Sequence, residues 1–126
     1  MKETVCVAVA LLGLITLSCK NVKEGGWEPI NLDKYEVSFG ASGGEGIISS
    51  SNYPEILVSD LMNFDNGEHG LRNEYGKTAS LDGIELATEG NRLTIRVSAS
   101  AESHTWKIVL WHLDAFSQPI YVYQNR

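Results

Sequence analysis

Carboxylates are the first residues in this chain that could do chemistry, because a pair of them can hydrolyse a glycosidic bond. Such a pair needs a cleft in which burial raises the pKa of one carboxyl group. The acidic residues of the central region fall instead in predicted short loops or at strand ends: Asp60, Asp65, Glu68, Glu74, Asp82 and Glu85. We interpret them as solvated surface charge, and we predict that the protein is not an enzyme.

Patterns that bind metals are equally weak. The histidines, His69, His104 and His112, show neither an H-x-H nor an H-E-x-x-H spacing. Residues 63–67 (NFDNG) faintly resemble a calcium loop, but they lack its alternating oxygen ligands and its distal glutamate, so we interpret them as a turn. The serine run at 49–51 has no His or Asp placed to activate a hydroxyl group. We predict no metal and no cofactor.

Aromatic residues near the carboxyl end are the best candidates for ligand binding. Residues 104–125 read HTWKIVLWHLDAFSQPIYVYQN, which predicts a hairpin of two strands. Successive side chains of a strand point to opposite faces, so Trp106 and Trp111 fall on opposite faces of the first strand. Tyr121 and Tyr123 alternate with aliphatic residues in the second strand. The hairpin therefore carries apolar bulk on both faces, and one of them is a candidate binding surface.

The elements that must position this hairpin are also strands. Alternating or β-branched patterns lie at 35–39, 45–51, 55–61, 83–87 and 91–98. Within 55–61, alternation places Ile56, Val58 and Asp60 on one side. The stretch 63–77 is polar and rich in turn residues, and its Asn66-Gly67 pair is a strong hairpin signal. About seven to eight short strands without a helical period predict an all-β sandwich.

The amino terminus has the pattern of a secretory signal. Lys2 precedes a nearly uncharged apolar run at 5–17, which is shorter than the about 20 residues that a membrane-spanning helix needs. The alternative, a buried helix of a cytosolic domain, has no amphipathic stripe to support it. Residues 16–19 (TLSC) resemble the lipobox of bacterial lipoproteins, with the apolar residue one position late. This resemblance implies a signal peptide at 1–18 and lipid attachment at Cys19.

The rest of the chain then divides into a lipidated cysteine with a flexible tether at 19–33 and a single domain at 34–126. We interpret Trp27 in the tether as folded against the domain edge, with a contact at the membrane interface as the alternative. Cys6 leaves with the signal peptide and the other cysteine is lipidated, so no disulfide is expected. The net charge of −6 makes nucleic acid and anionic lipid poor partners.

The domain also resembles a known family at both of its ends. The matching stretches are YEVSF (35–39), the Gly43-Gly44 turn, IISSSNY (47–53), NRLTIRV (91–97), TWKIVL (105–110) and IYVYQ (120–124). They resemble BACON domains, which are Bacteroidetes-associated modules described as carbohydrate-binding and often N-terminal. The resemblance implies an immunoglobulin-like antiparallel β-sandwich over 34–126 and no catalytic residues. The chain departs from the family at Pro54-Glu55 and in the stretch 63–77.

The resemblance also orients the hairpin, because the inward positions of such domains match Trp106, Ile108, Leu110, Ile120 and Val122. Trp111, Tyr121 and Tyr123 are then left on the outer face, where we predict a partly exposed aromatic strip that binds a ligand. The strip requires Tyr121 to lie beside Val109, and a slip of one residue would exchange the two faces. The alternative is that the tether or the stretch 63–77 covers these rings.

Two functions are compatible with these features. The first is a non-catalytic, lipid-anchored module of the cell envelope that binds a glycan or a glycoprotein through its outer aromatic residues. The second is a structural or accessory lipoprotein subunit that contacts a protein partner or acts as a spacer. In both, the lipid anchor is expected to hold the protein at the outer membrane, with its periplasmic or surface orientation left open.

Overall fold

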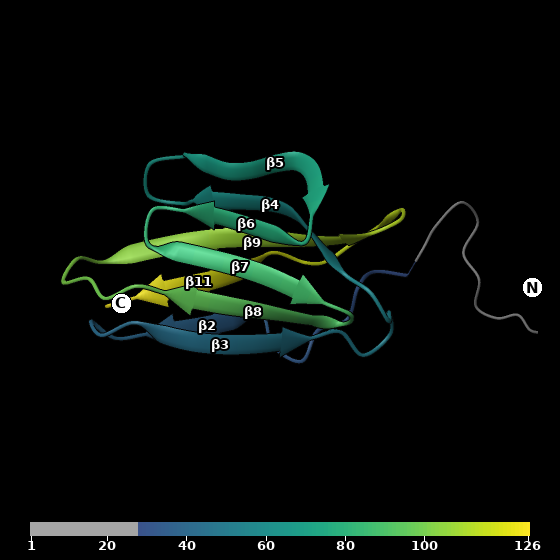
Figure 1. Cartoon of the computed structure of the whole chain (residues 1–126), viewed down its shortest axis with the longest axis horizontal. Helices are drawn as coiled ribbons and strands as arrows, with labels where there is room; N and C mark the ends of the chain where they lie inside the picture. The colour runs from purple at the N-terminus through teal and green to yellow at the C-terminus, as the bar shows by residue number, and fades with distance from the viewer. Residues whose placement is uncertain (1–27) are drawn as a thin grey trace, which may run out of the picture.

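The computed structural model describes residues 28–126, apart from the side chain of Asn73, and shows two packed β-sheets (Figure 1). The all-β sandwich of two sheets predicted from the sequence is confirmed. The described residues form ten strands, where the sequence predicted about seven to eight. The predicted signal peptide, the predicted lipid attachment at Cys19 and the tether up to residue 27 lie outside the described residues.

The larger sheet has six strands. Its order in space is β2 (Glu36–Phe39), β11 (Ile120–Gln124), β9 (His104–His112), β4 (Leu57–Asn63) and β5 (His69–Gly76), and β10 (Ala115–Phe116) pairs with the end of β9. Neighbouring strands are antiparallel except β2 and β11, which run parallel. Because β2 and β11 are parallel, these two strands, which are far apart in the sequence, begin at the same end of the sheet.

The smaller sheet has four antiparallel strands in the order β3 (Gly44–Ser49), β8 (Arg92–Val97), β7 (Ile84–Glu89) and β6 (Thr78–Leu81). In Figure 1 it lies in front of β9, β11 and β2. Each sheet buries one face against the other, which is how a sandwich excludes water from its core. In the described part of the chain, no helix has the length and hydrophobicity to cross a bilayer.

The core follows from alternation along the strands. In β8 the residues Leu93, Ile95 and Val97 are buried while Arg92 and Arg96 are exposed, as the sequence predicted. The inward set of the carboxyl-terminal hairpin is also confirmed, because each of these side chains is fully buried: Trp106, Ile108, Leu110, Ile120 and Val122. Burying an aliphatic or aromatic side chain of this size stabilises the fold by about 1.5–3 kcal/mol.

The stretch 63–77 differs from its prediction as a polar turn region, because it contains β5. The strand is hard to recognise from sequence since it lies at the edge of its sheet, where few side chains are buried. Gly70 lets it approach β6: a Cβ atom there would lie 2.3 Å from the backbone oxygen of Ser80. The predicted turn at Asn66-Gly67 is confirmed, and Gly67 has a φ of 79°.

A β-bulge changes the predicted faces of β4. The pairing of this strand with both neighbours shifts between Val58 and Asp60. An extra residue in a strand reverses the alternation beyond it. Asp60 therefore faces outward, although it was predicted on the side of Ile56 and Val58, and Leu61 takes the buried position.

The folded region begins before the predicted boundary at residue 34. Ile30 is 1% exposed, its backbone N–H donates to the carbonyl oxygen of Phe116 over 3.2 Å, and Leu32 forms a bridge with Ser50. The polar composition of the predicted tether hid these two apolar residues. Because they alternate, both can face the sandwich, and burying them adds to the core.

Candidate functional site

The outer face of the six-stranded sheet carries the three aromatic residues predicted as ligand contacts. In β9 the outward positions alternate with buried ones, so Trp111 points away from the core that Trp106 and Leu110 fill. Tyr121 and Tyr123 are the outward positions of β11. All three rings are partly exposed. They lie on the predicted face, and ligand binding by them stays a prediction.

These three rings form two groups rather than one strip. Tyr121 lies opposite Lys107 of β9, whereas the predicted strip required it beside Val109. Trp111 lies further along β9 than Lys107 by four positions, about 14 Å in a strand that rises about 3.4 Å per residue. The offset arises because β10 pairs with the end of β9 and so displaces the start of β11.

The first group, called here the Trp111 cluster, consists of Leu57, Tyr75, Trp111 and Phe116. Tyr75 of β5 stacks on Trp111 with 4.0 Å between ring centroids and 8° between ring planes. Leu57 and Phe116 occupy the paired positions on either side of Trp111. Tyr75 is 47% exposed and covers part of Trp111, which is the partial cover by the stretch 63–77 that the sequence left open. Tyr75 is therefore the more accessible ring of the stacked pair.

The second group, called here the Tyr121 cluster, consists of Phe64, Tyr121 and Tyr123. The rings of Tyr121 and Tyr123 are nearly parallel, with centroids 6.4 Å apart and planes 16° apart. Phe64, from the loop between β4 and β5, contacts Tyr121 edge to face at 5.8 Å and is 53% exposed. Edge-to-face contacts between aromatic rings are favourable beyond their buried area, so Phe64 and the two tyrosines support one another on an open surface.

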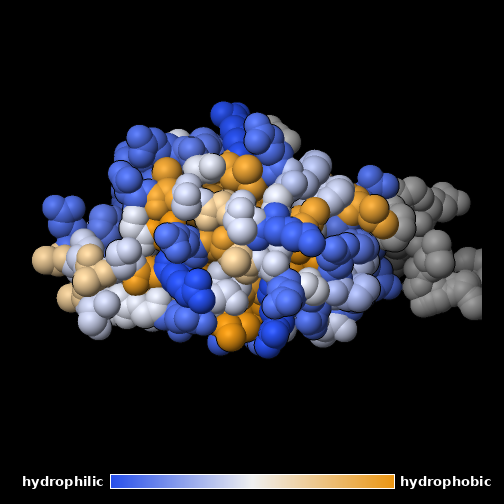
Figure 2. All heavy atoms as spheres, in the orientation of Figure 1, coloured by the Kyte–Doolittle hydropathy of each residue, from blue (hydrophilic) through white to orange (hydrophobic). Residues whose placement is uncertain are grey.

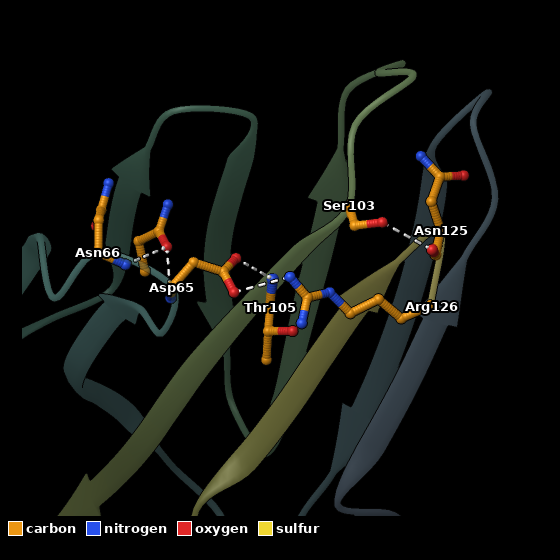
Figure 3. A network of polar contacts seen from close by, with 7 residues as sticks. Asp65, Asn66, Ser103, Thr105, Asn125 and Arg126 are labelled. Atoms are coloured by element: carbon orange, nitrogen blue, oxygen red, sulfur yellow. Dashed lines mark hydrogen bonds and ion pairs between the residues drawn. The ribbon is translucent and has the colours of Figure 1, made fainter.

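A network of hydrogen bonds fixes the loop that carries Phe64 (Figure 3). One carboxylate oxygen of Asp65 accepts from the backbone N–H of Thr105 over 3.0 Å, and the other pairs with Arg126 over 2.8 Å. The Asn63 side-chain oxygen accepts from the backbone N–H of Asp65 over 2.9 Å. The loop is thus tied both to β9 and to the chain beyond β11, the strand whose Tyr121 contacts Phe64.

Charged side chains lie between the two clusters. Asp60 of β4 lies opposite Arg72 of β5 in the strand register, and its carboxylate lies 2.9 Å from a ring nitrogen of His69. Lys107 lies between Met62 and Tyr121 in the paired strands. Among the described residues, the side chains of Arg72 and Lys107 have no hydrogen bond or ion pair within the protein. Their donors are therefore available to a ligand.

The residues weighed as metal ligands or catalytic groups are spread over the structure. The polar partners of the three histidines all differ: Asp60 for His69, Ser100 for His104 and the carbonyl group of Glu55 for His112. In the calcium-like stretch the Asp65 carboxylate contacts Thr105 and Arg126. Within residues 28–126 no three His, Cys, Asp or Glu side chains come together in a way that could hold a metal ion.

The outer face of the four-stranded sheet has a different character. Its four strands contain no aromatic residue. Arg96 lies between Glu45 and Glu85 in the paired strands, and its Nε atom is 3.3 Å from the Glu45 carboxylate. Ile47, 42% exposed, is a large hydrophobic side chain on this side. Figure 2 shows strongly hydrophilic residues distributed over this face. The aromatic surface is therefore confined to one sheet.

Sequence reasoning missed Phe64, Tyr75 and Phe116, although the structure places them in the two clusters. Phe64 and Tyr75 fall in the stretch predicted as polar turns, and Phe116 falls in the predicted loop of the hairpin. Their signal was present as isolated large rings among turn residues, which a polar loop does not need. Only the folded structure shows which rings they contact.

Comparisons with known proteins support the fold. No protein-family model and no curated protein matches the chain. The NMR structure of a protein from Bacteroides thetaiotaomicron is similar with a TM-score of 0.62 and 18% identity, over 85% of this chain and 96% of that chain. The structure of WR4, a C. elegans MSP family member, has a TM-score of 0.38 and 17% identity over 75% of this chain and 94% of that chain, a likeness too weak to build on. At such identities the likeness concerns the fold alone.

Proposed function

We propose that this protein is a non-catalytic binding module and that the outer face of its six-stranded sheet binds a glycan or a glycoprotein. The observation that carries the proposal is the arrangement of two aromatic clusters, about 14 Å apart along β9. Between them lie charged side chains that have no partner among residues 28–126. This arrangement combines apolar platforms with hydrogen-bonding groups on one open surface.

The chemistry of sugars suits such a surface. A pyranose ring has an apolar face of C–H groups that packs on an aromatic ring, and its hydroxyl groups need hydrogen-bond partners when they leave water. Tyr75 and Phe64 supply exposed rings, 47% and 53% exposed respectively. Lys107 and Arg72 supply donors between them that no other described group uses.

A binding screen on an array of glycans tests the proposal. We expect the wild-type chain to bind a subset of the glycans, and Tyr75→Ala and Tyr121→Ala to lose most of that binding. Ile47→Ala is the matched control, because it removes a similarly exposed apolar side chain from the opposite sheet. Trp111→Ala is a less clean test, since it also removes the support of Tyr75. If the wild type and all variants are silent, the glycan proposal fails.

A protein partner is the second candidate, and one observation favours it. The same face carries side chains that cannot hydrogen-bond to sugar hydroxyl groups, including Val109, Met62 and Phe116. Apolar and aromatic residues of this kind are enriched at the centres of protein interfaces. A module that is silent on the glycan array but captures a defined envelope protein, with capture lost in Phe116→Ser and kept in Ile47→Ser, would support this candidate.

The proposal places the module in the cell envelope, with a lipid at Cys19 holding it to the outer membrane. The support is the lipobox-like run 16–19 after an apolar segment of signal-peptide length. Several buried acyl chains bind a membrane far more firmly than one, at about 0.8 kcal/mol per methylene group. Cells fed labelled palmitate should label the wild type and leave Cys19→Ser unlabelled. Equal labelling of both chains would refute the anchor without touching the binding proposal.

A further inference from the structure

A hollow of about 310 Å³ opens beside Tyr121, at the end of the sheet where β2 and β11 begin. Its lining comes from two segments that lie far apart in the sequence: Tyr35, Glu36, Gln118, Pro119 and Tyr121. They meet because β2 and β11 are parallel, with Glu36 opposite Tyr121 and the backbone N–H of Tyr121 bonded to the carbonyl oxygen of Tyr35 over 3.0 Å. The hollow is therefore built on paired backbone rather than on a free loop.

The polar side-chain groups that line this hollow are available to bind a ligand. Among the described residues, the Glu36 carboxylate and the Gln118 amide group have no side-chain hydrogen bond or ion pair. The Tyr35 hydroxyl oxygen accepts from the backbone N–H of Leu32 over 3.1 Å, which fixes the ring and leaves its proton free to be donated. An acceptor pair, an amide group and a hydroxyl group thus surround a space that the protein does not fill.

The aromatic wall of the hollow is held in place from outside. Tyr121 contacts Phe64 at 5.8 Å and Tyr123 at 6.4 Å between ring centroids. Phe64 in turn is fixed through its neighbour Asp65, which bonds to Thr105 and Arg126. A ring supported in this way loses little conformational freedom when a ligand packs against it.

We infer that the hollow is a seat for a single neutral pyranose unit of a glycan. The inference deepens the proposed function and rests on it. The C–H face of the sugar packs on Tyr121, while two neighbouring hydroxyl groups donate to the two oxygens of Glu36 and a third group pairs with Gln118. The volume is at the low end of ligand pockets, about 300–1,000 Å³, so one sugar unit fits and the rest of the glycan continues along the open face.

Titration with small sugars tests the seat. The probes are the methyl glycosides of glucose, galactose, mannose and N-acetylglucosamine, added to the full chain while its NMR amide signals are followed. We expect at least one probe to shift the signals of residues 35–36 and 118–121. Glu36→Gln should weaken that probe at least about tenfold, because it removes a charged acceptor of two hydroxyl protons. Glu85→Gln, a matched change on the opposite sheet, should leave the dissociation constant unchanged.

Each other outcome overturns the inference. If the probe binds Glu36→Gln and Gln118→Ala as tightly as the wild type, or if only signals near Tyr75 and Trp111 move, the hollow is not the seat although the glycan proposal stands. If neither the methyl glycosides nor any glycan of the array binds, both proposals fail together. Choline is included as a cationic probe: if choline occupies the hollow and the sugars do not, the hollow is an ammonium site instead.

Discussion

Replacing Asp65 separates the two bonds that hold the Phe64 loop on the sheet. In Asp65→Ala, the backbone N–H of Thr105 loses its acceptor, and Arg126 loses its ion pair. In Asp65→Asn, the side-chain oxygen can still accept from Thr105 while the ion pair is lost. In Arg126→Ala, only the ion pair is lost. The three variants therefore compare the loss of both bonds with the loss of the ion pair alone.

The two bonds differ in environment, and the expected costs follow from it. Thr105 is 4% exposed, and leaving its N–H group without an acceptor costs about 1–3 kcal/mol of unfolding free energy. The Arg126 and Asp65 side chains are 43% and 35% exposed, and an ion pair of that kind contributes about 0–1 kcal/mol. We expect Asp65→Ala to lose about 2–3 kcal/mol, and Asp65→Asn and Arg126→Ala to lose about 1 kcal/mol or less.

Urea unfolding measures these differences, provided that the slope of free energy against urea is the same in all four chains. Repeating the measurement at 1 M salt should abolish most of the Arg126→Ala effect, since the Debye length falls to about 3 Å. It should leave most of the Asp65→Ala effect. If Arg126→Ala costs as much as Asp65→Ala, or if Asp65→Asn is as damaging as alanine, the hydrogen bond to Thr105 is not what holds the loop.

Three further predictions concern the sandwich itself, each measured as unfolding free energy. Gln124→Ala should cost about 2–4 kcal/mol, because its buried amide group donates to the carbonyl oxygens that follow β2 and β8; a loss below about 1 kcal/mol would show that this bridge is not needed. Gly43→Ala should destabilise the fold strongly, because the φ of Gly43 is 75° and a Cβ atom there would lie 2.1 Å from the backbone oxygen of Val97. Gly40→Ala should be nearly neutral, because a Cβ atom there meets open space. Equal losses of unfolding free energy in the two variants would contradict this prediction. Trp106→Phe should cost clearly less than the about 3–5 kcal/mol of Trp106→Ala, because the buried indole N–H has no partner to lose in the described part of the chain. Equal losses would show that the hydrogen bonding of the indole matters.

The fold was predictable where alternation is regular. In β8 every second residue is aliphatic and buried, and in β11 the aliphatic Ile120 and Val122 are buried, so the inner face follows the alternation. Alternation, together with the inward positions implied by the family resemblance, placed Trp111, Tyr121 and Tyr123 on the outer face. It failed in β4, where the bulge before Asp60 reverses the alternation without any mark in the sequence. Alternation is a local signal, and a bulge is decided by the neighbouring strands.

The composition of the candidate site was much less predictable than its face. The stacking of Tyr75 on Trp111 depends on β5, a strand whose sequence HGLRNEYG has few of the features of a buried strand. The hollow beside Tyr121 depends on the parallel pairing of β2 with β11, which joins residues more than eighty positions apart. Contacts of this kind are set by the topology of the sheet, and no local pattern reports them.

The most direct test of the central claim is to locate a bound glycan on one of the two sheets. A glycan that binds on the array is added to the labelled chain, and the shifted amide signals are mapped onto the strands. We predict shifts in β9, β11 and the β4–β5 hairpin, with β3, β8, β7 and β6 almost unchanged. Shifts confined to those last four strands would contradict the account, because the ligand would then bind the sheet that has no aromatic residues.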